Sequence, residues 1–241
     1  MTHFSDGLVV GGAITNTVIG SQGGFGVQTS QSIVLDIQPL TKNAAALAAS
    51  QSPASAALTL SAGTSVTAIV VNGQTRYVLD TPRAVTITSG GNDTGIAFLI
   101  SGYDVYGKAM SQLLTGASGS VATTKKAFAS VTSIVPNGAV ATTVTAGTAD
   151  LFGIPIRLID KGYISSLNWA NVLAYDTGTM TIYDSTSPAT NLTGDVRGTY
   201  VPSTASDGSK RLILEVLLST SQTNANGGAA VTTAILGVTQ A

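Results

Sequence analysis

Hydrophobic and polar residues alternate with a period of two along much of this 241-residue chain. Such alternation places successive side chains on opposite faces of an extended strand, so it predicts β-structure. The alternating segments are short, rich in Val, Ile, Thr and Tyr, and bounded by Gly, Asn, Asp and Pro. They predict an all-β fold, a β-sandwich or a jelly-roll-like body. The main segments are 32–37, 66–71, 76–79, 84–88, 96–101, 140–145, 179–183 and 211–218.

Three dipeptides mark turns between these segments. Asn72-Gly73 separates two strands at hairpin distance and suits a type I′ turn, in which both central residues take positive φ. Asn137-Gly138 is expected to join 131–135 to 140–145 in the same way. Asp207-Gly208 precedes the apolar strand at 211–218.

Two regions depart from the alternation. Residues 1–32 are rich in glycine and are interpreted as an extended N-terminal arm ordered against a neighbour, with a flexible terminus as the alternative. Residues 33–241 form the β-rich body, as one unit or as two β lobes with a boundary near residue 150. Within 43–57, a helical turn over Ala44–Ala49, ended by Pro53, and an Ala-rich loop are both open.

The charge content is low for a soluble globular chain. Charged residues make up 10%, against about 25% on average, and the net charge is −1. No basic stripe suits nucleic acid, and the two adjacent basic pairs, Lys125-Lys126 and Lys210-Arg211, are expected at solvated strand ends. Mean hydropathy is +0.34, yet no apolar run approaches the roughly 18 residues of a membrane span. We therefore expect part of the surface to be buried against other subunits.

The residue types restrict the chemistry. The chain has no cysteine and a single histidine, His3, so thiolate metal sites, a cysteine nucleophile and an ordinary Ser-His-Asp triad lack their ligands or base. The sequence predicts no enzyme, no cofactor and no metal site, and a small-molecule ligand is not expected. Calcium at the turn Gly91-Asn92-Asp93 and sugar stacking on Trp169 remain alternatives, although core or interface packing is favoured for Trp169. A convergent carboxylate pair also remains open; its candidates are Asp160, Asp176, Asp184 and Asp195.

The stretch ISGYDVYGKAM, residues 100–110, passes from an apolar strand into a polar turn. Tyrosine beside aspartate there suits a catalytic pair, a sugar platform or a corner between strands. The corner interpretation accounts for each residue type: Asp104 caps turn amides, Gly107 supplies positive φ, and Tyr103 and Tyr106 pack with bonded hydroxyls.

Ordered short motifs resemble structural proteins of tailed bacteriophages. The motifs lie at 79–116, beginning LDTPRAVTITSGG; at 125–136, KKAFASVTSIVP; at 147–158, GTADLFGIPIRL; and at 194–216, beginning GDVRGTYVP. The likeness spans about residues 75–216 and is greatest for head decoration, or cement, proteins. It differs from small cement proteins in length and in the first 60 residues.

The resemblance implies a non-enzymatic virion protein on the capsid exterior. Its expected partners are the major capsid protein and itself, as a homotrimer, with neither nucleic acid nor membrane. The N-terminus MTHFSDGLVV shows no secretory signal, so synthesis in the host bacterial cytoplasm is expected. The alternative is a carbohydrate-binding head-fibre or tail-associated adsorption protein. The structural or interface candidates are Phe25, Tyr103, Asp104, Tyr106, Gly107, Trp169, Arg197 and Tyr200.

Overall fold

The structure is a computed structural model that describes residues 17–18, 26–27, 31–186 and 190–218. The regular structure of these residues is antiparallel β-sheet, apart from a 3₁₀ turn at Lys161–Tyr163 (η2). The all-β prediction is confirmed, and the large curled sheets are consistent with a β-sandwich. Within the same ranges, no helix is long and apolar enough to cross a membrane.

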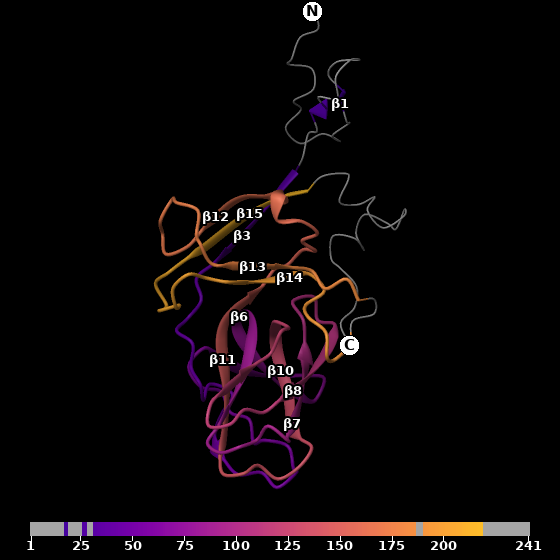
Figure 1. The fold of residues 1–241 in the computed structure, drawn as a ribbon, viewed down its shortest axis with the longest axis vertical. Helices are drawn as coiled ribbons and strands as arrows, with labels where there is room; N and C mark the ends of the chain where they lie inside the picture. The colour runs from indigo at the N-terminus through magenta and orange to yellow at the C-terminus, as the bar shows by residue number, and fades with distance from the viewer. Residues whose placement is uncertain (1–16, 19–25, 28–30, 187–189, 219–241) are drawn as a thin grey trace, which may run out of the picture.

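A ten-stranded sheet forms the larger part of the molecule (Figure 1). Its main path runs β13-β14-β11-β6-β10-β7-β8, while β4 pairs with β11 and both β5 and β9 pair with β6. The strands are β4 (Ala48–Gln51), β5 (Val66–Val71), β6 (Gln74–Ser89), β7 (Ala97–Tyr103), β8 (Ala109–Thr115), β9 (Val121–Thr123), β10 (Phe128–Pro136), β11 (Val144–Gly153), β13 (Thr179–Ile182) and β14 (Gly198–Val201).

The long strand β6 connects several parts of this sheet. It has 16 residues and joins two segments that the sequence presented as separate strands. Its first part lies between β5 and β10, and its last part pairs with β11 and β9. The register shifts between Phe128 and Ser130 on β10 and between Thr148 and Phe152 on β11, and in both ladders Arg83 is the partner at the shift. One continuous strand therefore changes partners at Arg83.

A three-stranded sheet covers the upper end of the molecule in Figure 1. Its order is β12 (Ile164–Asn168), β15 (Leu212–Leu218) and β3 (Gln31–Ile37). Strands β3 and β15 pair along their whole length, so the first strand of the body lies beside the last strand that the structure describes. A separate two-stranded pair joins β1 (Thr17–Val18) to β2 (Gly26–Val27).

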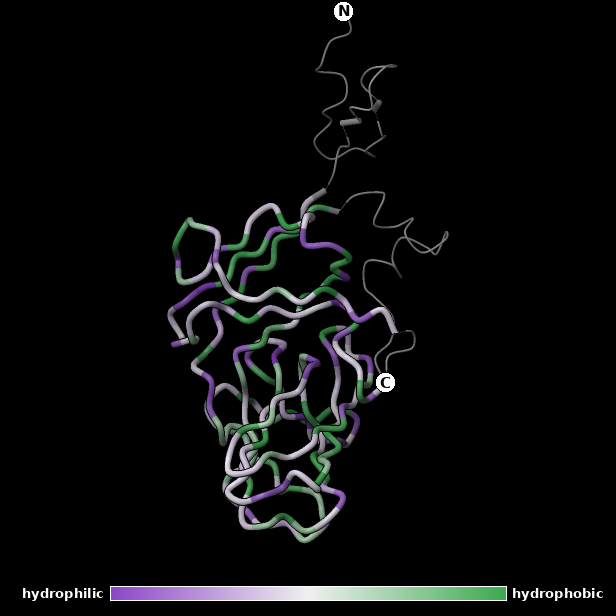
Figure 2. Tube along the Cα trace, viewed as in Figure 1, coloured by the Kyte–Doolittle hydropathy of each residue, from purple (hydrophilic) through white to green (hydrophobic). Residues whose placement is uncertain are grey.

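The protein has two hydrophobic cores, whose buried residues come before and after 147–151 in the sequence. The first is built from residues 46–146 and includes Phe98, Phe128 and Ile134, all fully buried. The second extends from Phe152 to Val216, and apolar residues of β3 pack against it. Buried and less buried residues alternate along β7 and β8, so these strands present one face to a core, and Figure 2 shows the accompanying change between hydrophobic and hydrophilic positions along the chain.

The turn predictions had mixed outcomes. Asn72 and Gly73 have φ of 51° and 78° and close the β5–β6 hairpin as expected. The predicted hairpin at Asn137-Gly138 is wrong, because β10 and β11 pair on opposite sides of β6 rather than with each other. Asn137 instead exchanges two hydrogen bonds with Ala97 on β7, through its backbone amide and its side-chain oxygen.

The two irregular regions can be compared only in part. No helical turn forms over 44–49: Leu47 N donates to Ala146 O at 2.9 Å, and β4 then begins at Ala48. Most of the predicted arm, 1–32, including Phe25, lies outside the described residues. Strand β3 begins at Gln31, within the predicted limit of the arm.

Candidate functional site

The turn between β7 and β8 has the geometry of a capped corner. Asp104 Oδ1 accepts hydrogen bonds from the backbone amides of Tyr106 at 2.9 Å and Lys108 at 2.8 Å. Gly107 has φ of +73° and donates its amide to Asp104 O at 3.0 Å. This conformation favours glycine, since an L side chain at positive φ is strained. The residues thus occupy the positions that the corner interpretation assigns to them.

The corner is anchored to Arg197, the residue before β14, through a buried ion pair. Asp104 Oδ2 lies 2.9 Å from an Nη atom of Arg197, and the two residues are 3% and 4% exposed. The Arg197 guanidinium also lies 5.3 Å from the Tyr106 ring centroid. Both carboxylate oxygens of Asp104 therefore bond within the protein, which argues for a structural rather than a catalytic carboxylate.

Tyr106 bridges the corner to the second core. Its hydroxyl donates to the carbonyl oxygen of Pro155, while the residue stays 42% exposed. Burial raises the pKa of Tyr106 above its ordinary value; the Arg197 charge opposes this and the Asp104 charge adds to it. The phenol therefore remains a donor in neutral solution and holds the corner to the segment after β11.

An apolar pocket of about 220 Å³ opens beside this corner. Its lining is mainly apolar, with Leu35 and Ile37 of β3, Pro82 of β6, Val105 of the corner, and Ile154 and Pro155 after β11. Two charged residues, Asp195 and Arg197, also line it. Val105, between the two anchored residues, is 42% exposed. The arrangement suits an apolar side chain or group rather than a charged substrate.

Three other predicted residues serve internal packing. Tyr103 is half-buried, donates to Gln74 Oε1 at 3.0 Å, and has the Arg76 guanidinium 3.5 Å from its ring centroid. Trp169 is 3% exposed in the second core, with its indole N–H donating to Thr204 Oγ1 at 3.0 Å. Tyr200 is fully buried. Trp169 and Tyr200 thus offer almost no surface to a partner.

Tyr200 belongs to a small polar cluster around Asp176. The carboxylate accepts hydrogen bonds from the hydroxyls of Tyr200 and Ser203. Burial raises the pKa of Tyr200, and the Asp176 carboxylate raises it further. For Asp176, burial alone raises the pKa, but the hydrogen bonds from Ser203 and Tyr200 bring it below the ordinary value. The cluster ties the end of the 169–178 loop to β14.

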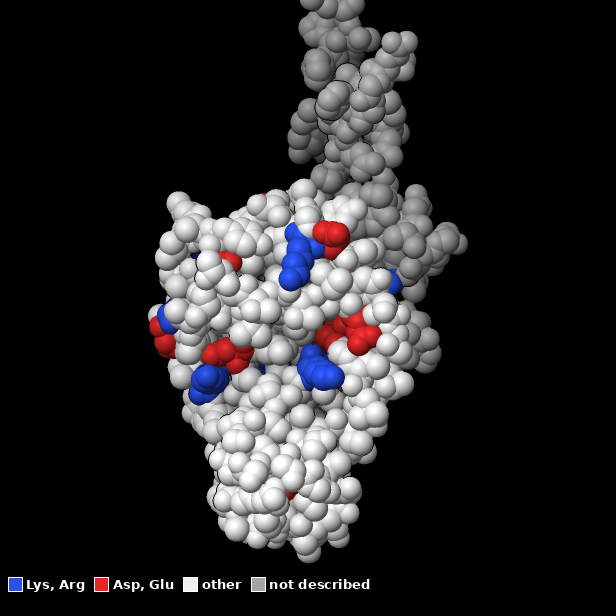
Figure 3. Space-filling model, viewed as in Figure 1, with Lys and Arg blue, Asp and Glu red and all other residues white. Residues whose placement is uncertain are grey.

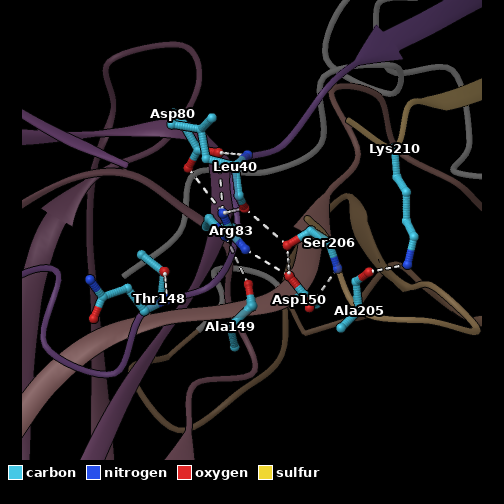
Figure 4. Close-up of polar contacts among 10 residues, drawn as sticks. Leu40, Asp80, Arg83, Thr148, Ala149, Asp150, Ala205, Ser206 and Lys210 are labelled. Carbon is cyan, nitrogen blue, oxygen red and sulfur yellow. Dashed lines mark hydrogen bonds and ion pairs between the residues drawn. The ribbon is translucent and has the colours of Figure 1, made fainter. Parts of the chain in front are cut away.

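Sequence reasoning missed the most connected side chain, Arg83, shown in Figure 4. It is fully buried, and its guanidinium bonds to Asp80 at 3.1 Å and to Asp150 at 2.7 Å. It also donates to the carbonyl oxygens of Leu40 at 3.0 Å and Ala149 at 2.9 Å. The spacing of Asp80 and Arg83 in LDTPR was the only local signal for this contact, and Asp150 lies far along the sequence.

Ser206 extends the Arg83 cluster to the loop before β15. Its hydroxyl donates to Asp150 Oδ1 at 2.6 Å and to Leu40 O at 2.9 Å, and its amide donates to Asp150 Oδ2 at 3.1 Å. Four separate segments therefore meet at the point where β6 changes partners. The cluster is placed between the two cores and holds them together.

Lys126 corrects the expectation of a solvated basic pair. Its side chain is fully buried and donates to Ser111 O at 3.0 Å, while Lys125 stays exposed. Burial lowers the pKa of Lys126 to about 8, against the opposing charges of Asp195 and Asp184. Asp195 Oδ1 and Oδ2 accept from the amides of Arg197 and Ala127.

The described residues offer limited means for metal or acid–base chemistry. They contain no group of three or more His, Cys, Asp or Glu side chains arranged to hold a metal ion. At the turn considered for calcium, Asp93 is fully buried and its Oδ1 accepts from Ala141 N at 2.7 Å. Asp176, Asp184 and Asp195, named above as carboxylate candidates, accept hydrogen bonds from neighbouring backbone amides.

Comparison with known proteins identifies no relative of this chain. No family model, no curated protein and no solved structure matches it. Its function is therefore argued from its own residues.

Proposed function

We propose that this chain is a structural protein of a tailed-bacteriophage virion, which decorates the capsid exterior and stabilises the shell by bridging neighbouring capsomers. The proposal includes the major capsid protein as partner and a homotrimer as the bound form. The observation that carries it is the distribution of side chains: charged residues are few and several are buried, while a set of large apolar side chains is exposed outside the two cores.

Charged side chains are unusually rare on the surface. The chain has 11 Lys and Arg and 12 Asp and Glu. Among the residues that the structure describes, seven of these are buried: Arg83, Asp93, Asp104, Lys126, Arg157, Asp195 and Arg197. Figure 3 shows the visible charges gathered over the middle and upper parts of the molecule, with an almost uncharged lower end. Such a surface suits burial against neighbouring subunits better than free solution.

Large apolar side chains are exposed to solvent at several positions. Leu173 is 99% exposed, Val70 is 71% exposed and Val34 is 57% exposed. Val105 adds an exposed apolar side chain beside the apolar pocket of the corner. These positions supply contacts for a partner without requiring charge pairs.

Capsid stabilisation follows from mass action. A subunit that binds the assembled shell but not its separate components stabilises the assembled state. Several moderate contacts around a symmetry axis then combine into strong overall binding. The rigid corner contributes a preformed surface, since its ion pair and caps already fix the backbone.

The test is binding of the purified chain to capsid shells that lack it, measured by co-sedimentation. Val105→Asp places a charge beside the apolar pocket and is expected to weaken binding at least tenfold. The matched control is Val121→Asp, another exposed valine, on β9. Equal binding of wild type and Val105→Asp would remove the corner from the interface, and no binding of wild type would contradict the proposed function.

Salt provides a second criterion. An interface with few charge pairs is expected to weaken less than about threefold between 0.1 and 1 M salt, because screening acts on charges. Release of the protein at moderate salt would mean that charge pairs hold it.

The carbohydrate-binding alternative requires exposed coplanar aromatics, whereas Trp169 is 3% exposed.

A further inference from the structure

Strand β5, with the sequence VTAIVV, is an exposed apolar edge of the ten-stranded sheet. Among the described strands it pairs with β6 alone. Its central residues are solvent-exposed, with Ile69 at 41% and Val70 at 71%. It contains no charge, no proline and no bulge, the features that usually protect an edge strand from pairing with another chain.

The free edge of β5 carries backbone groups able to accept another strand. Val71 and Gln74 flank the two-residue turn and form a hydrogen-bonded pair. Hydrogen-bonded pairs recur at every second position, so Ile69 with Arg76 and Thr67 with Val78 are the next such pairs between β5 and β6. Alternation directs the peptide groups of Ala68 and Val70 away from β6. At the start of this outer edge Val66 N donates to Gly63 O at 3.1 Å, whereas in the described part of the chain no group bonds to the peptide groups of Ala68 and Val70.

Three other edge strands of the described structure, β8, β4 and β3, are protected. On β8, Leu113 N donates to Asn191 O at 2.8 Å, so a loop covers the edge. On β4, the Gln51 side chain exchanges hydrogen bonds with the backbone of Thr59. On β3, Asp36 forms an ion pair with Arg211. The unprotected edge of β5 therefore contrasts with these three strands.

The β5–β6 hairpin is also held rigidly. Asn72 and Gly73 adopt the positive φ values of the turn, and the Arg76 guanidinium stacks 3.5 Å from the Tyr103 ring centroid. The Tyr103 hydroxyl donates to Gln74 on the second strand of the hairpin. A strand that is already ordered loses little conformational entropy on pairing.

We propose that β5 pairs antiparallel with β5 of a second copy of this chain, about a two-fold axis at Ile69; this contact is separate from the three-fold contact of the homotrimer proposed above. In this register Ala68 lies opposite Val70 of the partner copy, and both exposed peptide groups of each strand find partners. The contact is isologous, which means that both copies use the same surface. Each copy therefore supplies an uncharged, exposed strand that matches the strand of the other copy. A foreign strand would have to match both its alternation and its lack of charge.

Like charges do not oppose this pairing. The nearest cation on the hairpin is Arg76, on β6 opposite Ile69. In the paired sheet the two β6 strands are three strand spacings apart, about 14 Å at about 4.8 Å per spacing. That separation exceeds the screening length of about 8 Å at physiological salt.

Cysteine cross-linking tests the register directly, because the native chain contains no cysteine. Ile69 faces itself in a non-hydrogen-bonded pair, where Cα atoms lie about 4.5 Å apart, within the range that a disulfide spans. Ile69→Cys is expected to yield a covalent two-chain species under mild oxidation. Thr67→Cys and Val71→Cys, on the same face but far from their own copies, are expected to yield none.

A charge on the edge provides the second test. Val70→Lys is expected to lower the mass in solution relative to wild type and to weaken self-association at least tenfold, while Val121→Lys on β9 leaves both unchanged. Cross-linking of all three cysteine variants alike, or of none, would overturn the pairing. The same holds if Val70→Lys and the wild type have the same molecular mass in solution. These measurements use the isolated chain, so their outcome is independent of capsid binding.

Discussion

At the residue scale, Arg83 concentrates more interactions than any residue singled out from the sequence. Its guanidinium joins Asp80 and Asp150 and two carbonyl oxygens while fully buried between the two cores. Replacing both partners of a buried ion pair with apolar residues changes the stability of a protein little. Removing only one partner is costly, because it leaves the other charge buried and unpaired. Arginine suits the position because its planar fork reaches several acceptors at once.

Arg83→Met is therefore expected to lower the free energy of unfolding by about 3–5 kcal/mol. Arg83→Lys should recover only part of this loss, since one ammonium group cannot serve all the acceptors. The measurement is urea unfolding followed by emission of the single tryptophan, Trp169, which is buried in the second core. The control is Arg211→Met, which removes an exposed ion pair with Asp36 and should cost under about 1 kcal/mol.

Lys126 predicts a dependence of stability on pH. Its pKa falls to about 8 in the folded protein because of burial, against 10.5 for the ordinary side chain. Between these values the unfolded chain binds a proton that the folded chain has released, so stability rises with pH. The slope reaches at most about 1.4 kcal/mol per pH unit. Above about pH 10 the raised pKa values of Tyr106 and Tyr200 act in the opposite direction.

We expect the free energy of unfolding to rise from pH 8 to pH 10 in wild type and to lose that rise in Lys126→Met. Lys125→Met, which removes the exposed neighbouring lysine, should keep the wild-type profile. Parallel profiles for wild type and both variants would show that Lys126 does not titrate in this range.

At the element scale, close backbone contacts explain why small residues recur where strands cross. A Cβ atom on Gly147 of β11 would lie 2.0 Å from Asn43 O and 2.5 Å from Ala44 C. Both are backbone atoms, so the clash cannot be relieved by a side-chain rotation. This contact places the segment before β4 directly against β11 in the first core.

Gly147→Ala should therefore destabilise the protein by at least about 3 kcal/mol, at the upper end of the range for overpacking. Gly95→Ala is the matched control, because a Cβ atom there meets nothing within 4 Å and φ is not in the left-handed region. Thermal unfolding of both variants beside wild type provides the comparison. A small effect at Gly147 would mean that the segment near Asn43 lies farther from β11.

Local signals predicted individual strands and some turns, but not which strands pair. The limits of β5 and the turn at Asn72-Gly73 followed from alternation and positive φ, both of which are local properties. Asn137-Gly138 carries an equally strong local signal, yet β10 and β11 are separated by β6. The pairing of β3 with β15 links residues about 180 apart, and no local pattern specifies such a partner.

The corner at Asp104 could be predicted only in part, because some of its contacts are local in the sequence and others are long-range. Asp104 capping and the positive φ of Gly107 depend on neighbours in sequence, and the structure contains both. The Asp104–Arg197 ion pair, the Tyr106–Pro155 hydrogen bond and the pocket beside Val105 depend on the docking of β14 and β3, which the sequence pattern did not reveal. Burial of Lys126 was missed because an adjacent Lys pair has the appearance of a solvated end.

At the scale of the whole molecule, the two cores and the charge distribution make one consistent picture. Buried ion pairs at Arg83 and Arg197 fix the junction between the cores, and the lower end of the face shown in Figure 3 is almost uncharged. Exposed apolar positions then lie on an ordered framework, at the corner beside Val105 and along β5. This combination fits a protein whose role is to hold neighbouring subunits together.

The most direct test of the proposed role is the copy number of the chain in gradient-purified virions of a phage that encodes it. Quantitative gel densitometry against the major capsid protein gives the ratio of the two. The account predicts a number comparable to that of the capsid subunit, as expected for decoration of the whole lattice. A dozen copies or fewer would assign the protein to the portal or tail and contradict decoration, and its complete absence from the particles would contradict a virion role.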